Sequence, residues 1–155
     1  MSISCEQQPP IRGVRVIDLS DVWAGPATGM YLADQGADVV KVEPPDGDTT
    51  RLLYRASGMD TGLSYLALNR NKRGVRLDLR KPAGRAALHR LIDQADVLIL
   101  NLRLAAAAKL GLTYPELSRR NPQLVYCGIR GFGDKGPYAE HRAYDLLARA
   151  MTGIM

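Results

Sequence analysis

The sequence predicts an α/β fold, with a Rossmann-like, mostly parallel sheet and helices on both of its faces. Short, continuous apolar runs alternate along the chain with segments whose apolar residues recur at helical spacing. Strands that are apolar on both faces are typical of parallel sheets covered by helices. The 155 residues are enough for one domain with a sizeable core, and the sequence contains no internal repeat.

The first expected unit is a strand followed by a helix. Residues 14–19 form a short β-branched run that predicts the strand. Residues 26–36 predict the helix, because Pro26 suits a first helical position and Gly36 suits a C-terminal stop.

The middle of the chain continues this alternation. Residues 38–43 predict a second strand, and the segment 43–51, rich in Pro, Gly and Asp, predicts a loop. Residues 74–80 alternate apolar and polar side chains and predict a third strand. Residues 81–95 have helical spacing, and residues 96–100 form an apolar run that predicts a strand buried on both faces.

Two short helices and a last strand follow. Residues 104–112 predict one helix, and residues 114–122 predict another that ends at the Asn-Pro pair. Residues 123–133 predict a strand that runs into a glycine-rich loop.

The last segment, residues 142–155, predicts an amphipathic helix. Its apolar stripe consists of Leu146, Leu147, Ala150, Met151 and Ile154. Asp145 lies in the first turn, where the helix dipole favours an acid. The pattern shows no Gly, Asn or Pro stop signal after the helix, and we therefore expect it to lead into further chain.

Composition restricts the possible partners and location. The net charge of +5 is compatible with a polyanionic partner, but aromatic residues make up only 6% of the chain and no nucleic-acid-binding signature occurs. The apolar runs are too short to span a bilayer, and the first ten residues lack the pattern of a secretory signal. We therefore expect a cytoplasmic protein that binds a phosphorylated small molecule rather than nucleic acid or membrane, with a disordered lead-in at residues 1–11.

Several kinds of chemistry are absent from the sequence. Cys5 and Cys127 are not spaced as in a metal-binding motif. The sequence has no nucleophilic Ser or Cys motif that could form a catalytic pair with His89 or His141. The turn after the first strand, "SDVWAGPATGM", lacks the dinucleotide motif GxGxxG. Its helix amides either face an anion or simply close a tight turn. We expect no metal site, no serine nucleophile and no nicotinamide cofactor.

A basic run lies around the expected third strand. It is either ordinary surface charge or a set of arginines and lysines that meet a phosphate-rich ligand at the strand ends. Arg103 and Lys109 add two more positive charges after the next strand. The run consists of Arg70, Lys72, Arg73, Arg76, Arg80, Lys81 and Arg85.

Five blocks occur together and in order: "SDVWAGPATG", "VKVEPPDGDTTR", "LNRNKRGVRLDLR", "ADVLILNLR" and "YDLLARAMTG". Over residues 12–155 the chain resembles family III CoA-transferases, of the CaiB/BaiF type, which include formyl-CoA:oxalate and carnitine CoA-transferases. The resemblance implies that residues 12–155 are the Rossmann-like, CoA-binding part of a larger domain. It also implies an interlocked homodimer, acyl-CoA and a small carboxylic acid as substrates, and no metal.

The resemblance also implies which residues meet coenzyme A. The turn after the first strand is similar to the family's pantetheine and adenine contact, and the later basic residues match positions near the CoA phosphates. Where the family usually has N-x-R-P-G, this chain has "NLRLA". The loss of Pro and Gly changes the backbone conformations that this loop can adopt. The implied CoA-binding residues are Asp21, Val22, Trp23, Ala24, Leu77, Arg80, Arg103 and Lys109.

The mechanism that the resemblance implies is covalent. An aspartate of the family attacks the acyl-CoA thioester, and this aspartate is expected in a block beyond Met155, so no catalytic residue is assigned within the chain. A sister branch, the 2-methylacyl-CoA racemases, has a His–Asp pair where this chain has Tyr144 and Asp145. The tyrosine favours the transferase branch. A non-catalytic, CoA-binding remnant is the third interpretation.

Overall fold

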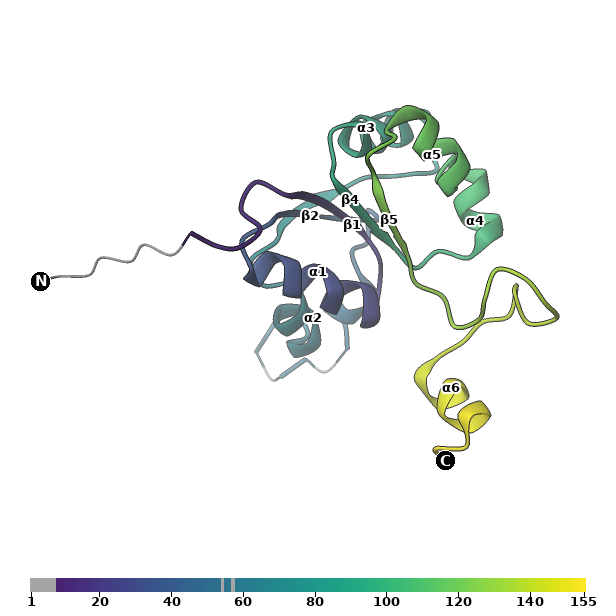
Figure 1. Cartoon of the computed structure of the whole chain (residues 1–155). Helices are drawn as coiled ribbons and strands as arrows, with labels where there is room; N and C mark the ends of the chain where they lie inside the picture. The colour runs from purple at the N-terminus through teal and green to yellow at the C-terminus, as the bar shows by residue number, and fades with distance from the viewer. Residues whose placement is uncertain (1–7, 54, 57) are drawn as a thin grey trace, which may run out of the picture.

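Five parallel strands form one sheet in the order β3-β2-β1-β4-β5 (Figure 1). The structure is a computed structural model that describes residues 8–53, 55–56 and 58–155. The alternation of strands and helices therefore gave the right fold class. The strands are β1 (Arg15–Leu19), β2 (Asp38–Glu43), β3 (Arg73–Arg76), β4 (Val97–Leu100) and β5 (Val125–Gly128).

The strand order reverses beside β1. Ile17 at the centre of β1 pairs with Val40 of β2 on one side and with Leu98 of β4 on the other. The chain thus builds β1, β2 and β3 outward in one direction and then returns to add β4 and β5 in the other. Ligands of such sheets bind outside the carboxyl ends of the strands, at this switch point.

Helices cover both faces of the sheet, as Figure 1 shows. On one face lies α1 (Ala24–Asp34), and α2 (Leu63–Leu68) packs against it. On the other face lie α3 (Pro82–Asp93), α4 (Leu104–Lys109) and α5 (Tyr114–Arg120). This arrangement confirms the predicted helices on both faces.

The core is divided by the sheet into two clusters. Ile17 of β1 packs with Leu88 and Ile92 of α3, whereas its neighbour Val16 packs with Ala33 of α1. Successive side chains of a strand point to opposite faces, so β1, β2, β4 and β5 contribute to both clusters, whereas β3 contributes only to the cluster of Ile17. This is why β1, β2 and β4 each have adjacent apolar residues that face opposite sides of the sheet.

The third strand is shorter than predicted. It ends at Arg76, although the alternation of residues 74–80 suggested that it would reach Arg80. The Asp78 carboxylate accepts a hydrogen bond from the backbone N–H of Arg80 at 3.1 Å, and the Asp78 carbonyl accepts one from Lys81 at 3.1 Å. These local bonds turn the chain before a longer strand can form.

One helix boundary and two short helical elements differ from expectation. The first helix begins at Ala24, so Pro26 is its third residue and not its first. Gly36 ends it as predicted, with a φ of +99° that favours glycine. The helix α2 had no counterpart in the prediction, and the expected loop at residues 43–51 contains the single 3-10 turn η1 (Thr49–Arg51).

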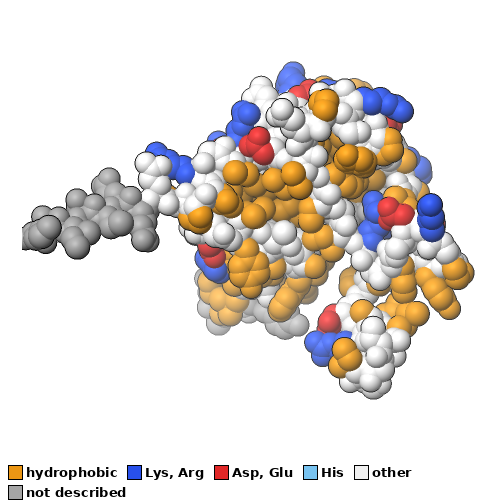
Figure 2. Space-filling model, viewed as in Figure 1, with side chains coloured by type: hydrophobic (Ala, Val, Ile, Leu, Met, Phe, Trp, Pro, Cys, Tyr) orange, Lys and Arg blue, Asp and Glu red, His pale blue; other side chains and the backbone are white. Residues whose placement is uncertain are grey.

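The last helix, α6 (Asp145–Thr152), has the stop signal that the sequence pattern was thought to lack. Gly153 adopts a φ of +74°, and the N–H of Ile154 donates to the Arg149 carbonyl at 3.0 Å. The prediction that no stop signal follows this helix was therefore wrong. In Figure 1, α6 stands apart from the sheet, and Figure 2 shows hydrophobic side chains exposed on it.

Residues 1–7 of the predicted lead-in, including Cys5, lie outside the described residues. Closer to β1, the N–H of Ile11 donates to the Gln35 carbonyl at 3.3 Å, and Pro9 lies against Gly36. These contacts join the chain before β1 to the end of α1. Among the residues the structure describes, no helix has the length and apolar character that crossing a membrane requires.

Candidate functional site

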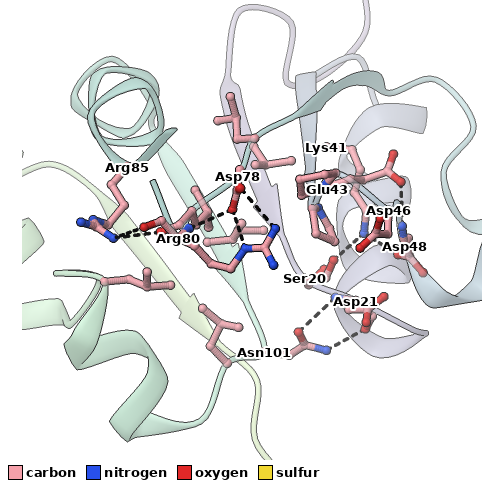
Figure 3. A pocket seen from close by; sticks show the side chains of 18 of the residues that line it. Ser20, Asp21, Lys41, Glu43, Asp46, Asp48, Asp78, Arg80, Arg85 and Asn101 are labelled. Atoms are coloured by element: carbon pink, nitrogen blue, oxygen red, sulfur yellow. Dashed lines mark hydrogen bonds and ion pairs between the residues drawn. The ribbon is translucent and has the colours of Figure 1, made fainter. Parts of the chain in front are cut away.

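A cavity of about 590 Å³ lies at the carboxyl ends of β1 to β4 (Figure 3). It is lined by residues that directly follow these strands, together with Arg85 of α3 and Lys109 at the end of α4. Leucines and prolines make much of its wall, while polar groups converge on it from the turns. Its place at the switch point and its mixed lining are typical of a small-molecule site.

A reciprocal pair of hydrogen bonds joins β1 and β4 at the edge of the cavity. The side-chain amide of Asn101 donates to the Asp21 carbonyl at 2.7 Å, and the Asp21 N–H donates to the Asn101 side-chain oxygen at 3.0 Å. Val22 follows in a left-handed conformation with a φ of +71°, which is strained for a β-branched residue. The turn after β1 therefore has a defined, strained backbone next to the ligand space.

Two carboxyl groups, Asp21 and Asp48, lie side by side on one wall of the cavity. Burial raises the pKa of Asp21, and the neighbouring Asp48 raises it further. Burial opposes ionisation of Asp48 as well, but bonds from Asp21 and Thr50 and the charge of Lys41 lower its pKa overall. Asp21 therefore retains its proton more readily, and Asp48 carries the negative charge.

Glu43 at the end of β2 is tied to the following loop. It accepts hydrogen bonds from Arg51 at 2.7 Å, from the Tyr65 hydroxyl at 2.7 Å and from the Asp48 N–H at 2.9 Å. Burial opposes its ionisation, but these donors lower the pKa of Glu43 to about 2. The loop after β2 is thus fixed by a charged group that stays ionised across ordinary pH.

The opposite wall is basic. Figure 3 shows Arg80 and Arg85 on the side away from Asp21 and Asp48. Arg80 pairs with Asp78 at 2.9 Å, and Arg85 donates to the carbonyls of Leu79 and Arg80 at 3.1 and 3.0 Å. A guanidinium has five N–H donors, so both arginines retain donors for an anion. The cavity is polarised, with one acidic and one basic wall.

The structure brings together four of the eight residues predicted to bind the cofactor. Asp21, Leu77, Arg80 and Lys109 line the cavity. The other four lie outside its lining: Val22 in the strained turn, Trp23 and Ala24 at the exposed start of α1, and Arg103 at the exposed start of α4. Ligand contact by all eight residues stays a prediction.

Several lining residues were missed by sequence reasoning. Ser20, Lys41 and Asn101 lie in or directly after a strand, and Asp48 lies in the loop that follows β2. Their position after predicted parallel strands was an available signal, because the carboxyl ends of such strands meet at one edge. The sequence did not indicate that Lys41 lines the cavity, because nothing in the pattern of this strand predicts that its lysine is buried.

Tyr144 and Asp145 are not among the cavity residues. Tyr144 is 71% exposed, and Asp145 pairs with Arg149 one turn later on α6, at 2.8 Å. His141 packs edge-on against Tyr138, with 5.3 Å between ring centroids. Across the described part of the chain, no group of three or more His, Cys, Asp or Glu residues is arranged to hold a metal ion.

Comparison with known proteins gives consistent matches. The family model described as CoA-transferase family III matches residues 11–155. The chain is 46% identical to a succinate–glutarate CoA-transferase of Agrobacterium fabrum, covering 96% of this chain and 39% of the relative. It is 35% identical to the human succinyl-CoA:glutarate CoA-transferase, covering 94% of this chain and 34% of the relative.

A solved structure shares the fold. It is a CAIB/BAIF family protein from Brucella suis, 44% identical, with a TM-score of 0.90 over 96% of this chain and 40% of that one. The chain thus spans two-fifths or less of the length of the relatives named here.

Proposed function

The chain belongs to CoA-transferase family III, and on that premise we propose that its cavity binds coenzyme A. We propose further that it is the CoA-binding part of an enzyme that moves CoA between an acyl-CoA thioester and a free carboxylic acid. One observation carries the proposal: the cavity at the switch point has an apolar interior and basic side chains on one wall.

The chemistry of coenzyme A suits that cavity. Its nucleotide end carries three phosphates, and its pantetheine arm is long and only weakly polar. Arg80, Arg85 and Lys109 offer charge-assisted hydrogen bonds to phosphate, while leucines line the remaining wall for less polar atoms. The raised pKa of Asp21 favours its neutral form, which reduces the negative charge beside a polyanionic ligand.

The transfer itself proceeds in this proposal through an aspartyl intermediate. A carboxylate attacks the thioester carbonyl and expels the CoA thiolate, leaving a mixed anhydride. The thiolate then attacks the aspartyl carbonyl and releases the first acid, and the second acid regenerates an acyl-CoA by the reverse steps.

None of the cavity's carboxylates is assigned the nucleophile's role. Asp21 is biased toward its neutral form, and Asp48 is held by Lys41 at 3.0 Å. A small carboxylic acid as acceptor, a cytoplasmic location and a homodimer belong to the same proposal.

The racemase-like alternative receives less support. It needs a base at the position of Tyr144, yet a phenol is poorly matched to proton abstraction near neutral pH. Asp145 is engaged with Arg149 on an exposed helix. We therefore retain the transferase proposal.

Calorimetric titration of the purified chain with coenzyme A tests the binding step. We expect binding that weakens as salt rises, because the phosphate contacts are screened. Replacing Arg85 or Lys109 by Ala is expected to weaken binding about tenfold, as for loss of one charge-assisted hydrogen bond. Arg119→Ala, on the exposed side of α5, is the matched control and leaves affinity unchanged. Absence of binding, or equal losses in all three variants, contradicts the proposal.

A second assay separates an enzyme from a non-catalytic remnant. The chain is mixed with an acyl-CoA and a free dicarboxylic acid, and the new thioester is followed by chromatography. Thioester transfer by the chain excludes the remnant. Binding of coenzyme A without transfer supports a CoA-binding portion that carries no nucleophile.

A further inference from the structure

We infer that Lys72 is a positioning residue. It lies beneath the β1–α1 turn, which we define as Ser20 to Pro26, and fixes the conformation in which this turn presents Asp21 to the cavity. Lys72 does not line the cavity itself, so it acts through the turn. The basic run of the sequence thus contains a residue whose charge faces inward rather than toward a ligand.

The Lys72 ammonium is buried and fully bonded. Its side chain is 1% exposed, and it donates to the Asp18 carboxylate at 2.8 Å, the Pro26 carbonyl at 2.7 Å and the Asn69 side-chain oxygen at 3.0 Å. An ammonium has three N–H donors, and each has an acceptor here. One side chain therefore links the segment before β3 to both β1 and α1.

Asp18 connects Lys72 to the start of the turn. Its second oxygen accepts hydrogen bonds from the backbone N–H of Ser20 at 3.1 Å and from the Ser20 hydroxyl. Asp18 and Ser20 are both buried, so these bonds form out of contact with bulk water. Lys72 thus holds the turn at Pro26 directly and at Ser20 through Asp18.

Two glycines of α1 allow the helix to approach this cluster. A Cβ at Gly29 would lie 2.9 Å from the Asp18 carboxylate and 3.2 Å from the Lys72 ammonium. A Cβ at Gly25 would lie 2.2 Å from the Ser20 side chain. The two positions are four residues apart and share one helix face, which rests on the buried polar cluster.

The restrained turn contains a strained residue. Val22 has a φ of +71°, a conformation that persists only when its surroundings impose it. The carbonyls of Ser20 and Pro26 flank it, and buried ammonium groups bind them: Lys41 binds the first and Lys72 the second. Loss of one anchor is expected to relax the turn and move Asp21 and Trp23.

Trp23 makes this movement measurable without any ligand. It is the one tryptophan of the chain and lies in the turn, 55% exposed. In Lys72→Met, checked for native circular dichroism, we expect the acrylamide quenching constant of Trp23 to change about twofold as the turn loosens. Arg73→Met is the matched control, because Arg73 pairs with Asp38 at the surface and leaves the turn alone. Its Trp23 signal should equal the wild type.

A second variant guards against simple unfolding. Lys72→Met leaves the buried Asp18 charge without its partner, which by itself destabilises the fold. Asp18→Asn combined with Lys72→Met removes both charges while Asn still accepts the bonds from Ser20, so the variant loses the Lys72 bonds to Pro26 and Asn69 without leaving a buried charge unpaired. A changed Trp23 signal in this folded double variant supports the inference, and a wild-type signal in it overturns the inference.

Coenzyme A gives an additional readout, and this arm rests on the proposed function. We expect affinity to fall about tenfold in the double variant, as for loss of a hydrogen bond from a charged donor, and not in Arg73→Met. If wild-type protein does not bind coenzyme A, the proposed function fails while the Trp23 readout still decides the role of Lys72. Unchanged affinity in the double variant counts against positioning.

Discussion

The cavity is surrounded by two sets of basic side chains that differ in what they bind. Lys41 and Lys72 lie beneath the turns, with side chains 2% and 1% exposed, and bind carboxylates and backbone carbonyls. Arg80 and Lys109 lie on the rim and are exposed to solvent. We refer to these as the floor lysines and the rim residues.

The difference shows that side chains of equal formal charge contribute unequally to the stability of the fold. A buried ammonium has lost its hydration and depends on its partners, so removal of the ammonium leaves an uncompensated carboxylate. An exposed guanidinium keeps its hydration, and its ion pair adds little to stability. Floor lysines therefore hold the fold, whereas rim residues remain available to a ligand.

The largest effect is expected at the floor. Lys41→Met leaves Asp48 buried without its counter-ion and the Ser20 carbonyl without a donor, so the free energy of unfolding should fall by about 3 to 5 kcal/mol. Urea denaturation followed by circular dichroism measures this. Arg73→Met, which removes an exposed ion pair, should cost less than about 1 kcal/mol. Equal losses in both variants would remove the distinction between buried and exposed basic residues.

Acid should weaken the fold through Glu43. Its folded-state pKa of about 2 lies below the ordinary glutamate value of 4.5, so its contribution is present above pH 4.5 and is lost as the pH falls toward 2. The loss is on the order of 3 kcal/mol, because one pKa unit corresponds to about 1.4 kcal/mol. Glu43→Gln should flatten the stability profile over this range. An unchanged slope in thermal melts from pH 5 to 2 would contradict the assignment.

The close approach of α1 to the floor predicts a smaller effect. Gly25→Ala places a Cβ 2.2 Å from Ser20 and should cost about 2 kcal/mol, although alanine favours helix by about 1 kcal/mol. Denaturation midpoints measure the change. Gly133→Ala is the control, since no atom lies within 4 Å of the added Cβ. A stabilised Gly25→Ala variant would show that Ser20 and its neighbours shift at little cost to admit the added Cβ.

The smallest effect on stability is expected at the rim. Arg80→Ala removes a side chain that is 81% exposed and paired only with Asp78 beside it, so the unfolding midpoint should not move measurably. Calorimetry should nevertheless show weaker binding of coenzyme A. A rim variant that destabilised the fold as much as Lys41→Met would contradict the comparison.

Local patterns predicted most of the architecture. The β-branched and apolar runs located all five strands, and Gly36 ended the first helix as expected, because periodicity and glycine conformations are local properties. The errors also had local causes. Asp78 ends β3 early through its own hydrogen bonds, and Gly153 ends α6 within residues 142–155, for which the sequence predicts one helix.

The site was less accessible to sequence reasoning. Asp21, Leu77, Arg80 and Lys109, which the family resemblance implied as CoA contacts, line the cavity, and their contact with a ligand stays a prediction. Asp48 and Asn101 were missed although both follow predicted strands; the bonds of Asn101 join it to Asp21, 80 positions away. The same holds for the burial of Lys72, which pairs with a carboxylate 54 positions away.

The sequence by itself determined a parallel α/β sheet and the edge of the sheet at which the cavity lies, because both follow from periodicity and from the order of strands and helices. Only the tertiary structure decided which charges are floor and which are rim. Burial depends on which segments meet in space. Lys72 and Arg73 are neighbours in one basic run, yet the packing buries the side chain of Lys72 and leaves that of Arg73 exposed.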